Sequence, residues 1–440
     1  MTTPEPRDVN TRNATDLPES FRMTELGPLP KKWRVVRLGE VAQLKQGKVL
    51  STRNFTQSGY PVFGANGQIG WCTEYTHENS EVLVTCRGAT CGTVNISPPK
   101  SFITNNAMVV TPFSESILRK DFLAFALMAI NLRKAITGTG QPQITKATLS
   151  SCDIPLPPLP EQRAIAHVLR TVQRAKEATE RVIAALKELK KSLMKHLFTY
   201  GPVPLDQADQ VPLKETEIGP VPEHWGIVPL KECAFVQTGA AKGRKLGSER
   251  TITVPYLRVA NVQDGYLDLS EIKYIRIRES ELDRYRLQPG DVVLTEGGDF
   301  DKLGRGFIWR GEIPNCIHQN HIFAVRVKQD TLLPEYLAYL VQSSYGKTYF
   351  LTVAHRTTHL ACINSTKLKG FPTLIPTLDE QKLIVNVLSA LDRKIEAEEA
   401  RKEALEGLFK TLLHHLMTGK VRLARAYVEQ FKACGSVEDD

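Results

Sequence analysis

A fifteen-residue stretch occurs twice in this chain and decides how the sequence is divided. Residues 24–38 read TELGPLPKKWRVVRL and residues 216–230 read TEIGPVPEHWGIVPL, with eight identities at an offset of 192. A second pair, LPEQRAIAHVL at 159–169 and LDEQKLIVNVL at 378–388, has six identities in eleven at an offset of 219. Repeats of this kind indicate duplicated structural units. The chain is therefore predicted to contain two copies of a globular segment followed by a long helix.

The two offsets show which part of the repeat has changed in length. Their difference places 27 extra residues in the second globular segment, whereas the helices keep one offset up to SLMKHLFTYG (192–201) and TLLHHLMTGK (411–420). This contrast favours two variable binding domains joined by a spacer of fixed length. The predicted order is a polar leader (1–23), a first globular domain (24–157), a first helix (158–201), a linker (202–215), a second globular domain (216–376), a second helix (377–423) and a C-terminal tail (424–440).

Composition limits the class of protein. A chain of 440 residues predicts about two to four domains. Its net charge of +9 favours an acidic polymer as partner, although many soluble proteins are mildly basic. Eight scattered cysteines without a CxxC pair argue against a zinc site and for a reduced, cytoplasmic setting. The N-terminus has no signal-peptide core, and the most apolar stretch, 122–132, is too short to span a bilayer, so a buried helix is expected there.

Each globular segment is predicted to be α+β with a sheet-rich core. Short alternating runs such as EVLVTC (81–86) and HIFAVRV (321–327) lie between Gly, Asn and Pro residues, as strands and turns do. Helices are expected at 121–136 and 334–343.

The two long helices carry the clearest periodic pattern. Apolar residues recur at alternating spacings of four and three, which is typical of a coiled coil, and residues 162–199 would span roughly 57 Å. Because the second helix must return the chain, the helices are predicted to pair antiparallel, with one globular domain at each end. The alternative is that each helix packs only on its own domain. The predicted seam residues are Ile165, Leu169, Val172, Ile183, Leu186, Leu193, Leu197, Ile384, Leu388, Leu391, Ile395, Leu405, Phe409, Leu412 and Leu416, with Lys176, Thr179, Lys190, Glu398 and Lys402 as polar interruptions suited to fixing the register.

Sequence motifs for catalysis are missing. There is no [ND]PP[YF] tetrapeptide for amino-methylation of a flipped base and no GxxxxGK[ST] phosphate loop. The Gly138–Gly140 segment lacks a third glycine, and two ExK tripeptides, at 188–190 and 271–273, are expected by chance in a basic chain. His414 and His415 fit a helix C-terminus better than a metal site. We therefore expect no catalytic residue and no metal ligand.

The remaining candidates are binding residues. A basic, Gly-rich loop follows the repeated Trp and Leu in both copies, and flexible Lys and Arg side chains suit phosphate contacts, although a solvated loop would look alike. The loop residues are Lys45, Lys48 and Arg53 in the first copy and Lys242, Arg244, Lys245 and Arg250 in the second. Candidates for contacts with base edges are Asn66, Gln68, Arg87, Arg258, Asn261, His355 and Arg356, of which Asn66 and Asn261 are also expected to stabilise turns.

The segment GTGQPQITKATLSSCDIPLPPLPEQRAIAHVL (138–169) resembles the specificity subunits of type I restriction-modification systems. The counterpart INSTKLKGFPTLIPTLDEQKLIVNVL (363–388) resembles the same junction, with Thr377 and Asp379 in place of two prolines. The domain starts at 27–48 and 219–243 are similar to those of this family, so the resemblance covers residues 24–423.

This resemblance implies two target-recognition domains, each reading one half of an asymmetric bipartite site in double-stranded DNA. The antiparallel coiled coil would set the distance between the half-sites. The family's partners are two modification subunits, which methylate adenine with S-adenosylmethionine, and two restriction subunits, which translocate and cleave DNA with ATP and Mg. The resemblance also implies a bacterial or archaeal source, and it assigns no base contacts residue by residue.

Two other classes of protein share some of these features. One is a fused restriction or modification enzyme with its own active site, which cleavage or methylation by the chain alone would reveal. The other is a coiled-coil scaffold that joins two proteins without DNA, which an absence of salt-sensitive DNA binding would reveal.

Overall fold

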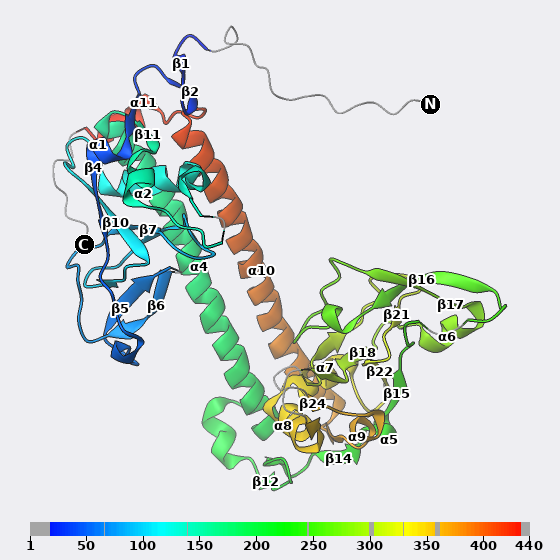
Figure 1. Cartoon of the computed structure of the whole chain (residues 1–440). Helices are drawn as coiled ribbons and strands as arrows, with labels where there is room; N and C mark the ends of the chain where they lie inside the picture. The colour runs from blue at the N-terminus through cyan, green and yellow to red at the C-terminus, as the bar shows by residue number, and fades with distance from the viewer. Residues whose placement is uncertain are drawn as a thin grey trace. The chain divides into compact units, whose positions relative to one another are not determined.

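A computed structural model of the chain describes residues 18–65, 67–138, 140–243, 246–298, 303–328, 330–356 and 361–432, apart from the side chain of Arg356. The chain divides into two compact units (Figure 1): unit 1 takes in the residues up to Glu180 and those from Ala400 onward, and unit 2 is Arg181–Glu399. Each unit combines helices with several small sheets, so the predicted α+β class is confirmed.

Unit 1 contains the first globular domain and parts of both long helices. Its helices are α1 (Leu38–Val41), α2 (Lys120–Ala129), α3 (Lys146–Ser150), the first half of α4 (Leu159–Tyr200), the second half of α10 (Leu378–Met417) and α11 (Arg425–Gln430). Its strands are β1 (Phe21–Thr24), β2 (Gly27–Pro30), β3 (Arg34–Arg37), β4 (Ala42–Gln46), β5 (Tyr60–Gly64), β6 (Gly67–Cys72), β7 (Val82–Thr85), β8 (Val94–Ile96), β9 (Phe102–Ile103), β10 (Ala107–Pro112) and β11 (Asp153–Leu156).

Unit 2 contains the second globular domain and the other halves of α4 and α10. Its own helices are α5 (Leu230–Cys233), α6 (Leu282–Tyr285), α7 (Pro334–Gln342), α8 (Ser344–Val353) and α9 (Ser365–Lys369). Its strands are β12 (Leu213–Lys214), β13 (Val221–Pro222), β14 (Gly226–Pro229), β15 (Ala234–Thr238), β16 (Thr251–Leu257), β17 (Lys273–Arg278), β18 (Val292–Thr295), β19 (Gly297–Gly298), β20 (Gly306–Ile308), β21 (Ile317–His318), β22 (Ile322–Val327), β23 (His355–Arg356), β24 (Ala361–Cys362) and β25 (Pro372–Ile375).

The two domains share one strand topology. The four-stranded sheet has the order β4-β10-β7-β8 in unit 1 and β15-β22-β18-β20 in unit 2, antiparallel throughout. Beside it lies a three-stranded sheet, in which β5 pairs antiparallel with β6 and parallel with β9, as β16 does with β17 and β21. A two-stranded pair, β11-β3 or β25-β14, joins the end of each domain to its beginning. The repeat seen in the sequence is therefore a duplicated fold.

A buried helix covers the core of each domain. In α2, six consecutive residues, Phe122–Leu127, are buried, because the helix is apolar on all sides and packs against the strands. α7 has the same place in unit 2, where Pro334 and Tyr336–Val341 are buried. The helix predicted over 121–136 is shorter than expected: α2 ends at Ala129, and a 3-10 helix at Leu132–Ala135 follows it, with the side chain of Asn131 capping the Arg133 amide.

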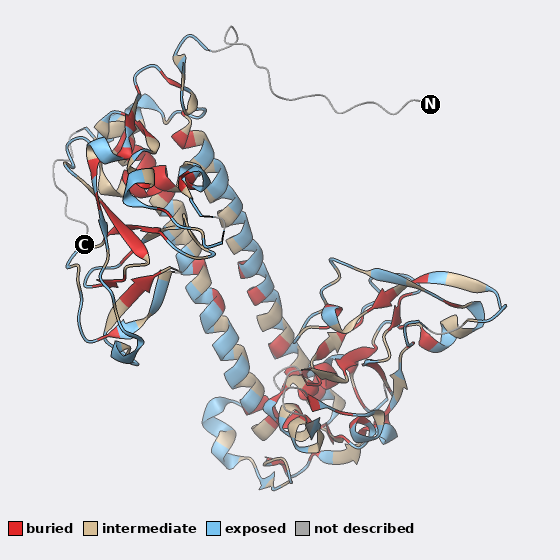
Figure 2. Ribbon diagram, viewed as in Figure 1, coloured by how far each residue is buried: buried red, intermediate tan, exposed pale blue. Residues whose placement is uncertain are grey.

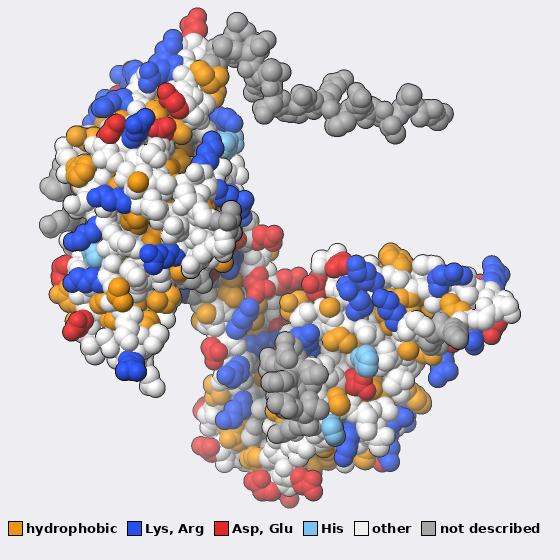
Figure 3. All heavy atoms as spheres, in the orientation of Figure 1, with side chains coloured by type: hydrophobic (Ala, Val, Ile, Leu, Met, Phe, Trp, Pro, Cys, Tyr) orange, Lys and Arg blue, Asp and Glu red, His pale blue; other side chains and the backbone are white. Residues whose placement is uncertain are grey.

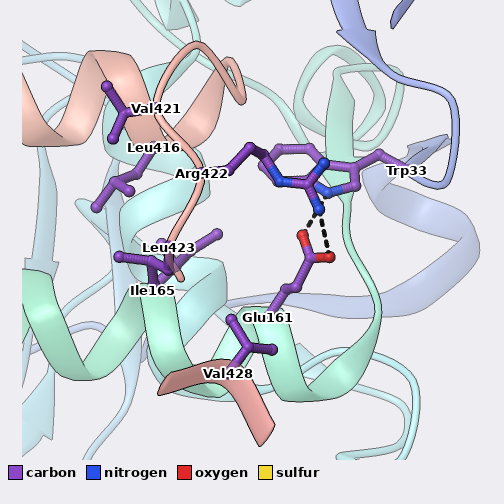
Figure 4. A pocket seen from close by; sticks show the side chains of 8 residues that line it. All are labelled: Trp33, Glu161, Ile165, Leu416, Val421, Arg422, Leu423 and Val428. Carbon is purple, nitrogen blue, oxygen red and sulfur yellow. Dashed lines mark hydrogen bonds and ion pairs between the residues drawn. The ribbon is translucent and has the colours of Figure 1, made fainter. Parts of the chain in front are cut away.

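The repeated Trp and the repeated Glu-Gln pair hold each long helix to its domain. In unit 1 the indole of Trp33 donates a hydrogen bond to Glu161 at 2.7 Å, and Arg422 forms an ion pair with the same carboxylate at 2.7 Å (Figure 4). In unit 2 the indole of Trp225 donates to Glu380 at 3.1 Å. Both tryptophans are buried, so the charge-assisted bond satisfies a donor that would otherwise be unpaired.

The glutamine of the same pair bridges three backbone groups. Gln162 is buried, accepts a hydrogen bond from the Arg119 amide and donates to the carbonyls of Ile117 and Pro157, each at 2.9 Å. Gln381 accepts from the Leu333 amide at 2.8 Å and donates to the carbonyls of Thr331 and Pro376 at 3.0 Å in the same way. The six identities in this part of the repeat thus include a helix anchor with the same bonds in both units.

The long helices pair antiparallel within each unit. In unit 1, Lys176 contacts Glu406 at 3.4 Å and Lys402 contacts Glu180 at 3.2 Å, so residue numbers rise along one helix as they fall along the other. In unit 2, Lys187 contacts Glu399 at 2.6 Å and Lys190 contacts Asp392 at 2.5 Å in the same sense. α4 has 42 residues and α10 has 40, about 63 and 60 Å at 1.5 Å per residue.

The apolar seam has the burial that its spacing predicts (Figure 2). None of the fifteen predicted seam residues is exposed: eight are buried and seven are half-buried. The buried ones are Ile165, Leu169, Ile183, Leu197, Ile384, Leu388, Ile395 and Leu416; the half-buried ones are Val172, Leu186, Leu193, Leu391, Leu405, Phe409 and Leu412. Thr179 and Glu398, two of the polar interruptions, are also buried, and their polar groups bond to Ala175 and Lys394 on the same helix.

Candidate nucleic-acid interface

The predicted binding loops of unit 1 meet at one end of its four-stranded sheet, where β4 and β7 finish and β10 and β8 begin. We call this end of the sheet its edge. Since neighbouring strands are antiparallel, the ends of β4 and β7 lie beside the starts of β10 and β8. Gly47, directly after β4, lies so close to the carbonyls of Ile103 and Thr104 that a Cβ would clash with them. The next residue, Lys48, donates its amide to the Ile103 carbonyl at 2.9 Å and accepts at its own carbonyl from the Asn105 amide at 3.0 Å. These hydrogen bonds therefore hold the basic loop to a segment that lies more than fifty residues later in the sequence.

The same edge exists in unit 2. Gly239 approaches the carbonyls of His318 and Gln319, Ala240 donates its amide to the His318 carbonyl at 2.8 Å, and the Asn320 amide donates to the Ala240 carbonyl at 3.1 Å. The glycine in each copy is required because only it leaves room for this backbone approach. The two basic loops thus leave equivalent positions of a duplicated scaffold.

The basic loops present their cations to solvent. Lys45, Lys48 and Arg53 are exposed in unit 1, and Lys242 and Arg250 are exposed in unit 2. Arg250 forms an ion pair with Glu279 at 3.0 Å but remains highly exposed. Arg244 and Lys245 lie outside the described residues. On the face drawn in Figure 3, Lys and Arg side chains are spread over both units, with a group of them on the upper part of unit 2.

The electrostatics of the unit 1 edge follow from its lysines. Burial is the largest cause of a lowered pKa at His77; the Glu81 carboxylate opposes it, and Lys45, Lys48 and Lys120 lower the pKa further. Lys120 is neutralised by Glu81 at 3.1 Å. Lys45 and Lys48 therefore contribute to a positive potential at this edge that suits phosphate.

The candidates for base contacts fall into two groups. Gln68, Arg87 and His355 are exposed near the sheet edges, whereas Asn66 and the Arg356 side chain lie outside the described residues. Arg258 is half-buried and is held by the carbonyl and the carboxylate of Glu271 at 3.3 and 3.7 Å.

Asn261 stabilises a turn, as expected. It is buried, accepts from the Arg258 amide and donates to the carbonyls of Asp268 and Glu271. Both N–H groups of its amide are used and the side chain is buried, so it presents no free edge to a base.

Long-range strand pairing brings further polar residues to the edges that the sequence did not single out. In unit 1 they are Asn106 and Gln143, and in unit 2 they are Glu296 and His321, whose side chains meet at 2.6 Å. Gln143 pairs with Arg87 across 56 residues of sequence, which no local pattern reveals. Aligning the strand ends of the two copies is the one signal that could have found them.

The described residues show no group of three or more His, Cys, Asp or Glu side chains placed to hold a metal ion. Among the helices in the same part of the chain, none is long and apolar enough to cross a membrane. What the geometry offers is two exposed, cationic loop clusters of equivalent design, each with amide, guanidinium or imidazole groups beside it.

A family model described as type I restriction modification DNA specificity domain matches this chain twice, at residues 30–188 and 222–407. The chain belongs to that family. The two matches follow the two copies of the fold, and each includes a globular domain with part of the long helix after it. The resemblance noted in the sequence is confirmed.

Relatives in this family are similar over nearly the whole chain. The type I restriction enzyme MjaVIII specificity subunit of Methanocaldococcus jannaschii is 26% identical over 423 residues, which cover 92% of this chain and 96% of the relative. The EcoKI specificity subunit of Escherichia coli is 23% identical over 406 residues, covering 83% of each. The fold is similar to that of the type I restriction-modification S subunit from M. genitalium, with a TM-score of 0.57 at 18% identity over 87% of this chain and 96% of that one.

Proposed function

We propose that this specificity subunit binds an asymmetric, bipartite site in double-stranded DNA, with one half-site on each unit. The observation that carries the proposal is that one chain contains the same cationic sheet edge twice, on duplicated scaffolds with different side chains. Two different readers in one chain require two different half-sites, so the target is asymmetric.

The paired helices set the spacing of the half-sites in this proposal. They have nearly equal lengths, pair antiparallel in each unit and are anchored to both domains by the Trp-Glu and Gln bonds. A helix that is hydrogen-bonded along its whole length changes its span only in steps of about 1.5 Å per residue. It therefore suits the role of a ruler better than a loop of the same length.

The chain acts without catalytic residues of its own and directs partner subunits. Two modification subunits would methylate adenine with S-adenosylmethionine, and two restriction subunits would translocate and cleave DNA with ATP and Mg. Both activities would depend on this chain for the choice of site. The missing amino-methylation tetrapeptide and phosphate loop support this division of labour.

The test is to express the full chain with its modification subunit and map the methylated adenines in the cellular DNA. We expect one split motif with a fixed number of unspecified base pairs between its halves. Replacing residues 24–157 by the equivalent part of a related subunit should change one half of that motif and leave the other half and the spacing unchanged. A change in both halves, or a contiguous motif, would refute the two-reader proposal.

A further inference from the structure

Three segments of unit 1 meet at a short strand junction beside the cationic loop. The Cys86 amide donates to the Asn106 carbonyl at 2.9 Å, and the Ile144 amide donates to the Cys86 carbonyl at 3.0 Å. Arg87 and Gln143 face each other as an antiparallel pair, flanked by the bond from the Gly88 amide to the Pro142 carbonyl at 3.2 Å. Residues facing each other between such bonds have neighbouring side chains on the same side of the ladder.

Unit 2 repeats the backbone of this junction. The Glu296 amide donates to the His321 carbonyl at 2.9 Å, and the Ile363 amide donates to the Glu296 carbonyl at 2.8 Å. Gly297 faces Cys362, which also pairs with His355. The corresponding bonds of the two units agree within 0.2 Å.

The side chains at these positions differ although the backbone is the same. Cys86 corresponds to Glu296, Arg87 to Gly297, Asn106 to His321 and Gln143 to Cys362. Gly297 has no room for a side chain, since a Cβ would lie 2.7 Å from the Ala361 carbonyl oxygen and 2.9 Å from the Cys362 Cβ. A fixed backbone that carries different side chains is what a reader of different sequences needs.

The side chains of unit 1 are also free to act. Arg87 and Gln143 are exposed and Asn106 is half-exposed. Within the described part of the chain, their side chains make no hydrogen bond or ion pair, although each carries several donors or acceptors. By contrast, Arg258 and Asn261 are occupied by bonds inside unit 2.

We infer that this strand junction is the base-reading position of unit 1, with Arg87 and Gln143 contacting neighbouring base edges in one half-site. The inference rests on the proposed function and names its specificity-determining residues. Arg presents two donors that match guanine O6 and N7, and Gln presents a donor and an acceptor that match adenine N7 and N6. Lys45 and Lys48, on the adjoining strand end and loop, supply the phosphate contacts that set register without sequence choice.

The experiment selects binding sites from a randomised duplex library with the full chain in complex with its modification subunits. The variants are Arg87→Ala, Gln143→Ala and Arg87→Lys, which keeps the charge and loses the bidentate fork. We expect each variant to lose roughly 5- to 150-fold discrimination at one or two positions of a single half-site, from the 1–3 kcal/mol of a bidentate base contact.

Arg34→Ala and Gln43→Ala are the matched controls, because both residues are exposed in unit 1, on β3 and at the opposite end of β4 from the junction. They should leave every position of the motif unchanged. Thermal unfolding of each variant, expected to match the wild type, shows that the junction backbone is intact. The inference would be overturned if Arg87→Ala weakened binding to all DNA sequences equally, or if both junction variants selected an unchanged motif. Either result would leave the two-reader function in place. A wild-type complex that selects no sequence would refute the proposed function itself.

Discussion

The buried histidine of unit 2 makes the stability of that unit sensitive to acid. His318 is fully buried, its Nδ1 lies 3.2 Å from the Tyr285 carbonyl, and its Nε2 has no partner among the described residues. Burial, the largest cause, lowers the pKa of His318 from 6.5 to about 4. The unfolded chain therefore binds a proton at a higher pH than the folded chain does.

The size and sign of the effect follow from these two pKa values. The contribution of neutral His318 is fully present above pH 6.5 and is lost as the pH falls towards 4. A shift of this size corresponds to about 3 kcal/mol in total, of which about 2 kcal/mol is lost by pH 5. In unit 1 the equivalent position is Ile103, so the substitution His318→Ile replaces the imidazole with the residue that the duplicated fold already accepts there.

The assay is urea unfolding of the full chain at pH 8 and pH 5, read by pulsed hydrogen exchange on peptides from β16 and β21. We expect the wild type to lose about 2 kcal/mol more than His318→Ile between the two pH values, since all other titrating groups are shared. The control His355→Ala removes an exposed imidazole and should keep the pH dependence of the wild type. An identical loss in the wild type and in His318→Ile would refute the assignment of the acid sensitivity to His318.

Three further outcomes are expected. Gln162→Ala should lower the free energy of unfolding of unit 1 by about 3 kcal/mol in urea titrations, because it removes one buried and two partly buried hydrogen bonds to the backbone; a loss below 1 kcal/mol would contradict the anchor. Changing Lys45 and Lys48 to Ala should weaken DNA binding for all sequences and reduce the salt slope of log K by about two, and an unchanged slope in salt titrations would assign both to solvent. Inserting four residues after Ala178 and four after Ala397 should lengthen the preferred spacer by one to two base pairs, since about 6 Å of helix is added per insertion and DNA rises about 3.4 Å per pair; methylation mapping that finds only the original spacing would exclude the ruler.

The long helices could be predicted because apolar residues recur at a local, regular spacing. The duplication could be predicted because two segments of the sequence are repeated. Alternating spacings of three and four place Leu169 and Leu388 in the seam without knowledge of any distant contact. The identities of Trp33 with Trp225 were visible in the repeat, but their bonds to Glu161 and Glu380 join residues 128 and 155 positions apart. Spacing along the chain carries no information on such a pair.

The candidate interface could be predicted only in part. Lys48 and Arg87 stand in Gly-rich loops, where exposure follows from composition, and both are exposed. Arg258 was a candidate for base contacts like Arg87, yet Glu271 holds it, because the turn at Asn261 brings Glu271 close to it. Gln143 was not predicted, because its position at the interface depends on strand pairing with Arg87, and that pairing is set by tertiary structure.

The division between what is repeated and what differs supports a physical account of how such a chain changes its target. Gly47 and Gly239 keep the same close backbone approach, and the junction bonds keep the same lengths, because a shift of the scaffold would move every contact at once. Side chains at the junction differ at each equivalent position, and the exposed side chains of Arg87 and Gln143 make no bond among the described residues that such a change would break. A substitution such as Arg87→Gln therefore alters the chemistry offered to a base edge at little cost in stability. In the proposed function the helices meanwhile set the spacing, so recognition of each half-site and the distance between the half-sites would change independently.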